Sequence, residues 1–576
     1  MRGRFRRWVA VGVGSLTLTA AGVSMATAGQ ADQPTVKHVL LISVDGLHAS
    51  DVAQCEADNL CPTIAWLSGN GTTYTHAMTS EPSDSSPGLM ALMTGALPGL
   101  TGVYYDDTYD RTMYAPAAQT TSGTQDCTGA PGTETMYAEN IDTNAPSVAN
   151  GQVGTRTIMN ESIDPTQLPY QLKNGQCTPV EPNDFLRTNS IFSVAAAAGL
   201  RTAWADKHPA ADEEVAGHGT PNSVTDPFKT EINADIIPPT LTDTRGNTVT
   251  FPITNPTGTG PLFITDSVSD TASYDQIKVD AVLNEIDGMN SANTQHVGTP
   301  SIYGMNFQTV SVGQKLVDPI LSCARSGNGP GCDPTYVPGG YEPGTLAFTP
   351  QLQGAIASVD AQLGEMVSEL KAKGELHDTE IILTAKHGQS PIDPSKLALI
   401  GHAEDTVLSN AGIQVAQTTD DDVALLWLKD QSQTDAAVDA LKADQGASNT
   451  AHIQYILSGK SLTQKFSNPQ TDPRTPDIII QPIPGTIYST SKAKVMEHGG
   501  FSIDDTHVAM IVYNGAAHHD DDGGHGGHSG HSGAVIGSPV MTTQVAPTVL
   551  AALGLNYHKL DGVRIQHTQV LPGQDH

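Results

Sequence analysis

Short runs of leucine and β-branched residues recur along the chain and indicate buried strands. They occupy residues 38–45, 201–206, 380–386, 477–483 and 507–513. Within each run the apolar positions are continuous and show little alternation, which is typical of strands buried on both faces of a parallel sheet.

The clearest predicted helix spans residues 350–373. Its apolar residues recur at spacings of three and four, Thr349 and Pro350 suit a helix start, and Gly374 suits its end. This helix followed by the strand at 380–386 makes one helix-to-strand step of a doubly wound α/β sheet. Residues 105–190 and 210–300 have few periodic signals, and we interpret them as insertions forming loops, small strands and a cap over the active face.

The first 28 residues predict an export signal. A basic start precedes an apolar stretch that ends in the cleavage-like sequence Ala26-Thr27-Ala28. The apolar run is interrupted by Gly, Ser and Thr, so we expect no membrane anchor. Arg6-Arg7 has the outline of a twin-arginine signal, which leaves Sec and Tat export both open. We therefore expect a secreted protein, and we expect a single domain at residues 36–576.

The charge of the chain limits its partners. Across 576 residues, 61 acidic and 29 basic side chains give a formal net charge of -32, and 38% of the residues are hydrophobic. Such a chain can bury a substantial core, but its general surface is unsuited to nucleic acid or anionic lipid. An anionic substrate would need bound metals or a few local cations. The oligomeric state is not predicted.

Six cysteines in an exported chain indicate disulfides. Six cysteines allow 15 connectivities; the simplest pairs neighbours, namely Cys55–Cys61, Cys323–Cys332 and Cys127–Cys177. Zinc binding by the thiolates is the alternative, but no C-x-x-C pair is present.

The His/Asp/Gly-rich stretch at 518–533 is interpreted as a spacer in preference to a loose cation site, because its glycines fix no ligand geometry.

Chemistry-bearing residues follow the predicted strands. Asp45 ends the first strand, Lys386 and His387 follow the strand at 380–386, and His498 lies in a second His-Gly turn. In "EPSDSSPGLMALMTG", Ser85 stands at the start of a helix, where the macrodipole favours a nucleophile that attacks phosphorus. Helix capping is the structural alternative for this serine cluster. Together these residues indicate a metal-assisted phosphoryl-transfer site.

The motifs "VLLISVDGLHASDV", "ILTAKHGQS" and "MEHGGFSIDDTHVAMIV" resemble those of the type I phosphodiesterase/nucleotide pyrophosphatase group of the alkaline phosphatase superfamily. The resemblance implies an alkaline-phosphatase-like α/β fold, with a doubly wound, mostly parallel sheet flanked by helices. It implies that Ser85 is the nucleophile and a metal ligand, that Asp45 and His387 bind the same ion, and that His498 binds a second. The implied cofactor is one or two divalent metal ions, with Zn²⁺ favoured and Ca²⁺ or Mg²⁺ still open.

The chain also departs from that group. Lys386 replaces the usual Asp, "YGMNFQTVSVGQK" lacks the expected Asp and His, and Gly88 replaces a common Asn. Three compensations fit these departures: Lys386 as a fixed catalytic cation, neutral oxygen ligands in "YGMNFQTVSVGQK", or groups from a neighbouring strand end. The further candidate site residues on this basis are Asn306, Gln308, Asp206, Lys207 and His208.

The sequence therefore predicts a secreted metal-dependent hydrolase of small-molecule or lipid phosphate esters. Phosphodiester or nucleotide pyrophosphate bonds are the favoured substrates, cleaved through a seryl-phosphoryl intermediate. Sulfatase-like, phosphomonoesterase-like and phospholipase C-like hydrolysis remain alternatives. So does a non-catalytic binding protein on a degenerate hydrolase scaffold.

Overall fold

The computed structural model describes residues 36–145, 154–252, 263–317, 338–517 and 533–574. The predicted export signal, the Cys323–Cys332 pair and almost all of the 518–533 stretch lie outside these ranges. The predicted Cys55–Cys61 and Cys127–Cys177 disulfides are both present.

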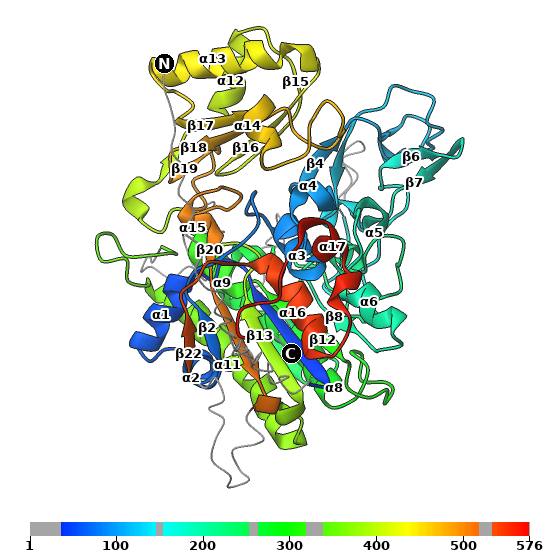
Figure 1. The fold of residues 1–576 in the computed structure, drawn as a ribbon, viewed down its shortest axis with the longest axis vertical. Coiled ribbons are helices and arrows are strands. Elements are labelled where there is room, and N and C mark those ends of the chain that lie inside the picture. Colours follow the sequence, from blue (N-terminus) through cyan, green and yellow to red (C-terminus); the bar gives the residue numbers. More distant parts are fainter. Residues whose placement is uncertain (1–35, 146–153, 253–262, 318–337, 518–532, 575–576) are drawn as a thin grey trace, which may run out of the picture.

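A six-stranded sheet forms the centre of the molecule (Figure 1). Its three parallel and two antiparallel strand pairs agree with the predicted α/β class. The strand order is β12 (Ile302–Phe307), β1 (His38–Val44), β13 (Thr379–Thr384), β21 (Met510–Asn514), β2 (Thr72–Tyr74), β22 (Ala534–Ile536).

Helices cover both faces of this sheet, as the strand pattern predicts. Alternate residues of β1 enter two cores: Val39 and Leu41 face one, while Leu40 and Ile42 face the other. The first core is closed by α3 (Ser85–Thr94), α6 (Ile191–Ala197) and α16 (Val545–Ala552). The second is closed by α1 (Ala49–Ala57), α2 (Pro62–Asn70), α8 (Val268–Ile286) and α11 (Pro350–Lys373). The predicted helix at 350–373 is thus confirmed.

Helix α8 lies inside the stretch that the sequence assigned to an insertion. It packs beside α11, so this part of 210–300 belongs to the helical layer of the core. The sequence does not predict this helix, because several of its buried positions are polar and interrupt the apolar periodicity, among them Asp275, Lys278 and Asn284.

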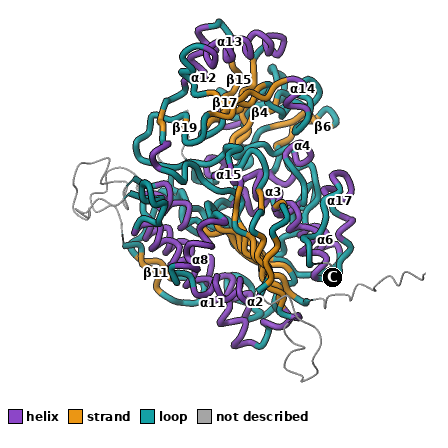
Figure 2. Tube along the Cα trace, turned by 60° about the vertical axis from the view of Figure 1, so that its left-hand side comes forward, coloured by secondary structure: helices purple, strands orange, loops and turns teal. Residues whose placement is uncertain are grey.

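A second, four-stranded antiparallel sheet lies above the first in Figure 1. It consists of β15 (Val415–Asp420), β16 (Ala424–Leu428), β18 (Ile478–Pro482) and β17 (Ile453–Ser458). One face packs on α12 (Ala403–Asn410) and α13 (Thr434–Gly446), and the other on Tyr104 and Tyr105. Figure 2 shows the two sheets as separate groups of strands.

Two of the predicted strands therefore do not run in a parallel sheet. The run at 477–483 forms β18 of the smaller sheet, and the run at 507–513 forms β20 (His507–Val508) and most of β21, which pairs antiparallel with β13. Continuous apolar runs report burial on both faces, and a covered antiparallel sheet provides the same burial.

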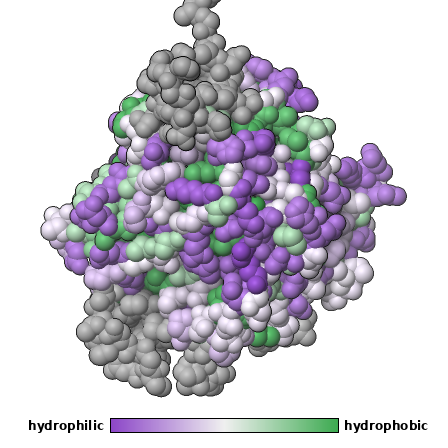
Figure 3. Space-filling model, turned by 90° about the horizontal axis from the view of Figure 1, so that it is seen from below, coloured by the Kyte–Doolittle hydropathy of each residue, from purple (hydrophilic) through white to green (hydrophobic). Residues whose placement is uncertain are grey.

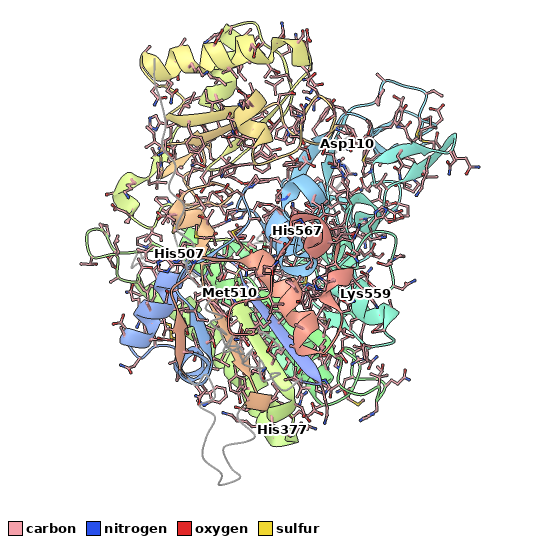
Figure 4. The ribbon with its side chains drawn as sticks, viewed as in Figure 1. Asp110, His377, His507, Met510, Lys559 and His567 are labelled. Atoms are coloured by element: carbon pink, nitrogen blue, oxygen red, sulfur yellow. A yellow bond between two sulfur atoms is a disulfide. The ribbon has the colours of Figure 1, made fainter. Side chains whose placement is uncertain are left out.

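Ion pairs join the 105–190 segment to the smaller sheet. Asp110, labelled in Figure 4, ends β4 (Asp107–Asp110). Its carboxylate accepts a hydrogen bond of 2.9 Å from the Arg474 guanidinium. Arg111 donates a hydrogen bond to Asp477, directly before β18.

On the face of the molecule seen from below, hydrophilic residues cover much of the described surface, with hydrophobic residues in smaller groups between them (Figure 3).

Gly304 sets how closely β12 approaches β1. A Cβ at this position would overlap the Leu41 carbonyl oxygen of the paired strand. We expect Gly304→Ala to lower the free energy of unfolding by about 1–3 kcal/mol, because a packed sheet does not absorb the extra methyl group. The measurement is the urea midpoint by circular dichroism.

Gly354→Ala is the matched control, since Gly354 lies exposed on α11 with open space where its Cβ would be. There alanine should stabilise by about 0.5–1 kcal/mol. An unchanged midpoint for Gly304→Ala would contradict this account of the sheet.

Candidate active site

Four strand ends meet at one edge of the central sheet. Asp45 follows β1, Lys386 lies two residues beyond β13, and Gln308 follows β12. Asp206 follows β8 (Ala203–Trp204), whose segment joins β12 through parallel bridges. All four segments run parallel, so their carboxyl ends lie together, where ligands bind in open α/β sheets.

Ser85 reaches this edge from the first turn of α3. Asp84 is the N-cap residue, and its carboxylate accepts a hydrogen bond of 3.2 Å from the Ser86 amide. The Ser85 hydroxyl lies 2.8 Å from Lys207 Nζ and 3.2 Å from His387 Nε2. A hydroxyl between an ammonium group and an imidazole at a helix start has the surroundings of an activated nucleophile.

The environment of His387 fixes which of its ring nitrogens carries a proton. Nδ1 lies 3.0 Å from the Gly388 carbonyl oxygen, which can only accept a hydrogen bond. Nδ1 therefore carries the proton of the neutral ring, and Nε2 is left as an acceptor for the Ser85 hydroxyl. The sequence predicts His387 at the site, but its contact with the Ser85 hydroxyl is visible only in the structure.

Lys386 lies buried between two carboxylates. Its ammonium group is 3.4 Å from Asp45 Oδ2 and 3.3 Å from Asp206 Oδ1. Burial disfavours the charged lysine, but the two carboxylates outweigh burial and raise the pKa of Lys386. Burial likewise opposes ionisation of Asp45, yet the positive charge of Lys386, together with that of Lys207, holds the pKa of Asp45 well below its usual value.

Amide groups saturate the rest of the Asp45 carboxylate. Gln308 Nε2 donates to Oδ2 at 2.6 Å. The surroundings of Asn306 orient its amide nitrogen toward Asp45 Oδ1, at 2.9 Å, and its oxygen toward Lys386 Nζ, at 3.2 Å. Both amides thus complete the hydrogen bonding around Asp45, with their nitrogens directed at the carboxylate.

His498 faces Asp84 on the other side of Ser85. Its Nδ1 lies 3.3 Å from Asp84 Oδ1, and its ring centroid is 4.0 Å from that of His387. Among the residues that the structure describes, neither of the two facing atoms has a hydrogen-bond partner. Burial, reinforced by the Lys315 ammonium, holds the pKa of His498 well below its usual value. The ring is therefore neutral.

His208 is the one predicted candidate that lies away from Ser85. Its Nδ1 is 3.0 Å from Glu231, and its Nε2 is 3.8 Å from Glu139. The structure thus brings together Ser85 and nine other residues around it, and turns His208 toward the insert. The nine are Asp45, Asp84, Asp206, Lys207, Asn306, Gln308, Lys386, His387 and His498.

Two supporting groups were not found from the sequence. His48 lies between the Asp51 carboxylate, at 3.0 Å, and the backbone of Gln389, at 2.9 Å, and so ties the turn after β1 to the turn after His387. Asp275 on α8 accepts hydrogen bonds from the Gln308 and Thr309 amides and fixes the end of β12. The only signal for His48 was its place three residues after Asp45.

The ligands for a pair of divalent metals are incomplete. Around Ser85 the acidic and imidazole side chains approach one another as two separate pairs, Asp45 with His387 and Asp84 with His498. In the part of the chain that the structure describes, the only group of three side chains able to hold a metal, with ligand atoms within 4.8 Å of one another, is His402 and Glu404 at the start of α12 and Asp420 at the end of β15. The residues present at Ser85 do not fit a two-metal centre.

Comparison with known proteins identifies the family. The chain from residue 39 to residue 507 matches the model of the type I phosphodiesterase/nucleotide pyrophosphatase family. The crystal structure of the wild-type alkaline phosphatase PafA is similar in fold, with a TM-score of 0.53 and 14% identity over 91% of this chain and 97% of that one.

Murine ectonucleotide pyrophosphatase/phosphodiesterase 5 aligns with a TM-score of 0.48 and 13% identity over 92% of this chain and 99% of that one. No curated protein matches the sequence significantly. Because the family match spans most of the chain and carries the Asp45, Ser85 and His387 motifs, the chain belongs to the type I phosphodiesterase/nucleotide pyrophosphatase family of phosphoric ester hydrolases.

Proposed function

We propose that this protein is a secreted hydrolase of phosphodiester or nucleotide pyrophosphate bonds and that Ser85 is its nucleophile. The observation that carries the proposal is the position of the Ser85 hydroxyl, 2.8 Å from Lys207 Nζ and 3.2 Å from His387 Nε2 at the start of α3. Attack by Ser85 on phosphorus would form a seryl-phosphoryl intermediate and release the first alcohol or phosphate group. Water would then cleave the intermediate.

The charges near Ser85 favour a diester over a monoester. Besides Asp45 and Asp206, the carboxyl groups of Asp84, Asp106 and Glu139 act on this region, against the ammonium groups of Lys207 and Lys386. Burial and the Asp84 carboxylate raise the pKa of Asp106 to about 7. A monoester dianion carries one more negative charge than a diester, so this surplus of carboxylates disfavours it more strongly.

Secretion is supported by the sequence of the first 28 residues and by the two disulfides, which persist in oxidising compartments. None of the helices in the described ranges has both the length and the apolar character that a bilayer span requires.

Divalent metal ions remain the cofactor that the family resemblance implies. Asp45 already accepts hydrogen bonds from an amide and pairs with lysine. The best remaining donors for a single ion are therefore Asp84 and His498, whose facing atoms have no hydrogen-bond partner among the described residues. No step of the proposed reaction depends on that ion. The Ser85 proton can be assigned to His387, which lies 3.2 Å from the Ser85 hydroxyl.

Ser85→Ala should reduce turnover of bis(4-nitrophenyl) phosphate by about 10⁴-fold or more, because it removes the attacking oxygen. Ser86→Ala is the matched control and should remain close to wild type, since capping at that position uses the backbone amide. The measurement is steady-state kinetics combined with acid quenching, which should trap a phosphoryl group on the peptide that contains Ser85. Full activity of Ser85→Ala, or a phosphoryl group on another residue, would refute the assignment.

A further inference from the structure

Two ammonium groups flank Asp45, the carboxylate expected to bind metal. Lys386 Nζ lies 3.4 Å from Asp45 Oδ2, and Lys207 Nζ lies 3.8 Å from the same oxygen. Lys207 also contacts the Ser85 hydroxyl. The positive charge that a metal ion would bring to a nucleophile and its carboxylate is therefore already present as two fixed cations.

A divalent ion on Asp45 would have to displace this arrangement. Zinc binds a carboxylate oxygen at about 2.0–2.2 Å, so it would lie within a few ångströms of both ammonium groups and be repelled by them. It would also compete with the Gln308 amide, which already donates to Asp45 Oδ2 at 2.6 Å. The chemistry of the surrounding groups thus opposes an ion at this position.

Gly88 is part of the same arrangement. A Cβ at this position would overlap the Lys386 carbonyl oxygen, so any larger residue would push away the segment that carries Lys386. The glycine that replaces the common Asn of the resembling group therefore allows the backbone of Lys386 to pack directly against α3. Two departures of the sequence, at Gly88 and Lys386, have one structural consequence.

The two lysines differ in exposure and therefore in their roles. The Lys386 side chain is 1% exposed and is held by two carboxylates, whereas the Lys207 side chain is 19% exposed and touches the reacting oxygen. Lys386 is a positioning residue that fixes Asp45 and Asp206. Lys207 is the cation that a substrate can reach.

From this geometry, and resting on the proposed function, we propose that Lys207 and Lys386 replace the metal pair and that this protein hydrolyses phosphodiesters without a divalent ion. Lys207 is the catalytic cation: it stabilises the developing charge on the Ser85 oxygen and on a non-bridging oxygen of the phosphodiester.

His387 carries the Ser85 proton through the proposed reaction. His387 Nε2 takes this proton as the Ser85 oxygen bonds to phosphorus, and the bond from phosphorus to the leaving oxygen breaks on the opposite side, where the leaving group takes a proton from solvent. In the second half, a water oxygen bonds to phosphorus on that opposite side and gives a proton to solvent. The bond from phosphorus to the Ser85 oxygen then breaks, and His387 returns its proton to Ser85.

Chelation tests this proposal directly. Enzyme dialysed against EDTA should keep its bis(4-nitrophenyl) phosphate activity while elemental analysis finds less than one ion per chain. The His402–Glu404–Asp420 group could retain an ion of its own, so the analysis is repeated with Glu404→Gln. The proposal would be overturned if chelation abolished activity and Zn²⁺ or Mn²⁺ restored it. It would also be overturned if active Glu404→Gln protein retained one ion per chain.

The same assay separates this inference from the proposed function. If chelation abolishes activity while Ser85→Ala is also inactive, the hydrolase and its nucleophile stand and the metal-free site fails. If the wild type cleaves no phosphodiester with or without added metal, the proposed function fails as well.

Lys207→Met should lower kcat by about 100-fold to 1,000-fold, the range for loss of one group that stabilises transition-state charge. KM should change far less, and Lys207→Arg should recover part of kcat. Lys229→Met is the charge-matched control, since Lys229 pairs with Glu213 away from Ser85. Equal losses in Lys207→Met and Lys229→Met would rule out a specific role for Lys207.

Lys386→Asp supplies a readout other than activity. It restores the carboxylate expected beside His387, so in the Glu404→Gln background it should bind Zn²⁺ more tightly than the Glu404→Gln parent does in titration calorimetry. Circular dichroism checks that the variant is folded. Equally tight zinc binding by the Glu404→Gln parent would show that Lys386 does not take the place of a metal. If the variant is unfolded, the chelation assay and the kinetics of Lys207→Met decide the proposal.

Discussion

The ion pairs of Lys386 with Asp45 and Asp206 hold the reacting edge of the central sheet together. Each of the three residues follows a different parallel segment, and each is almost completely buried. A buried charge is costly unless it is paired, and removal of one partner leaves the others uncompensated. The lysine therefore fixes the relative positions of three strand ends, and Ser85, Lys207 and His387 are placed with respect to that fixed group.

The position of Ser85 depends on a second constraint, the close approach of α3 to the end of β13. Gly88 permits backbone contact with Lys386, and Asp84 caps the helix so that Ser85 begins its first turn. Helix α3 is apolar around its circumference and packs into the core that contains β1. Packing of the helix thus orients Ser85, the proposed nucleophile.

The sequence could predict residues at the ends of strands, because strand pattern and motif order place them. Asp45, Lys386 and His387 follow continuous apolar runs, and Ser85 follows a capping pattern. The contact of Lys207 with Ser85 could not be predicted, since the two residues are 122 positions apart and meet only through the parallel bridges between the β8 segment and β12. The role of α8 was hidden for a related reason: Asp275 and Lys278 interrupt its apolar stripe, and they do so to fix the end of β12.

The same residues explain why a strongly acidic chain can serve an anionic substrate. A formal charge of -32 repels phosphate over the general surface. Close to Ser85, however, the effective dielectric constant is low, and a single ammonium group at contact distance outweighs distant, screened carboxylates. Lys207 is held at that distance by the β8 segment, and Lys386 offsets part of the negative charge of Asp45 and Asp206. Under the proposed function, Lys207 and Lys386 supply the local positive charge for phosphate, and the carboxylates around them favour a substrate with a single negative charge.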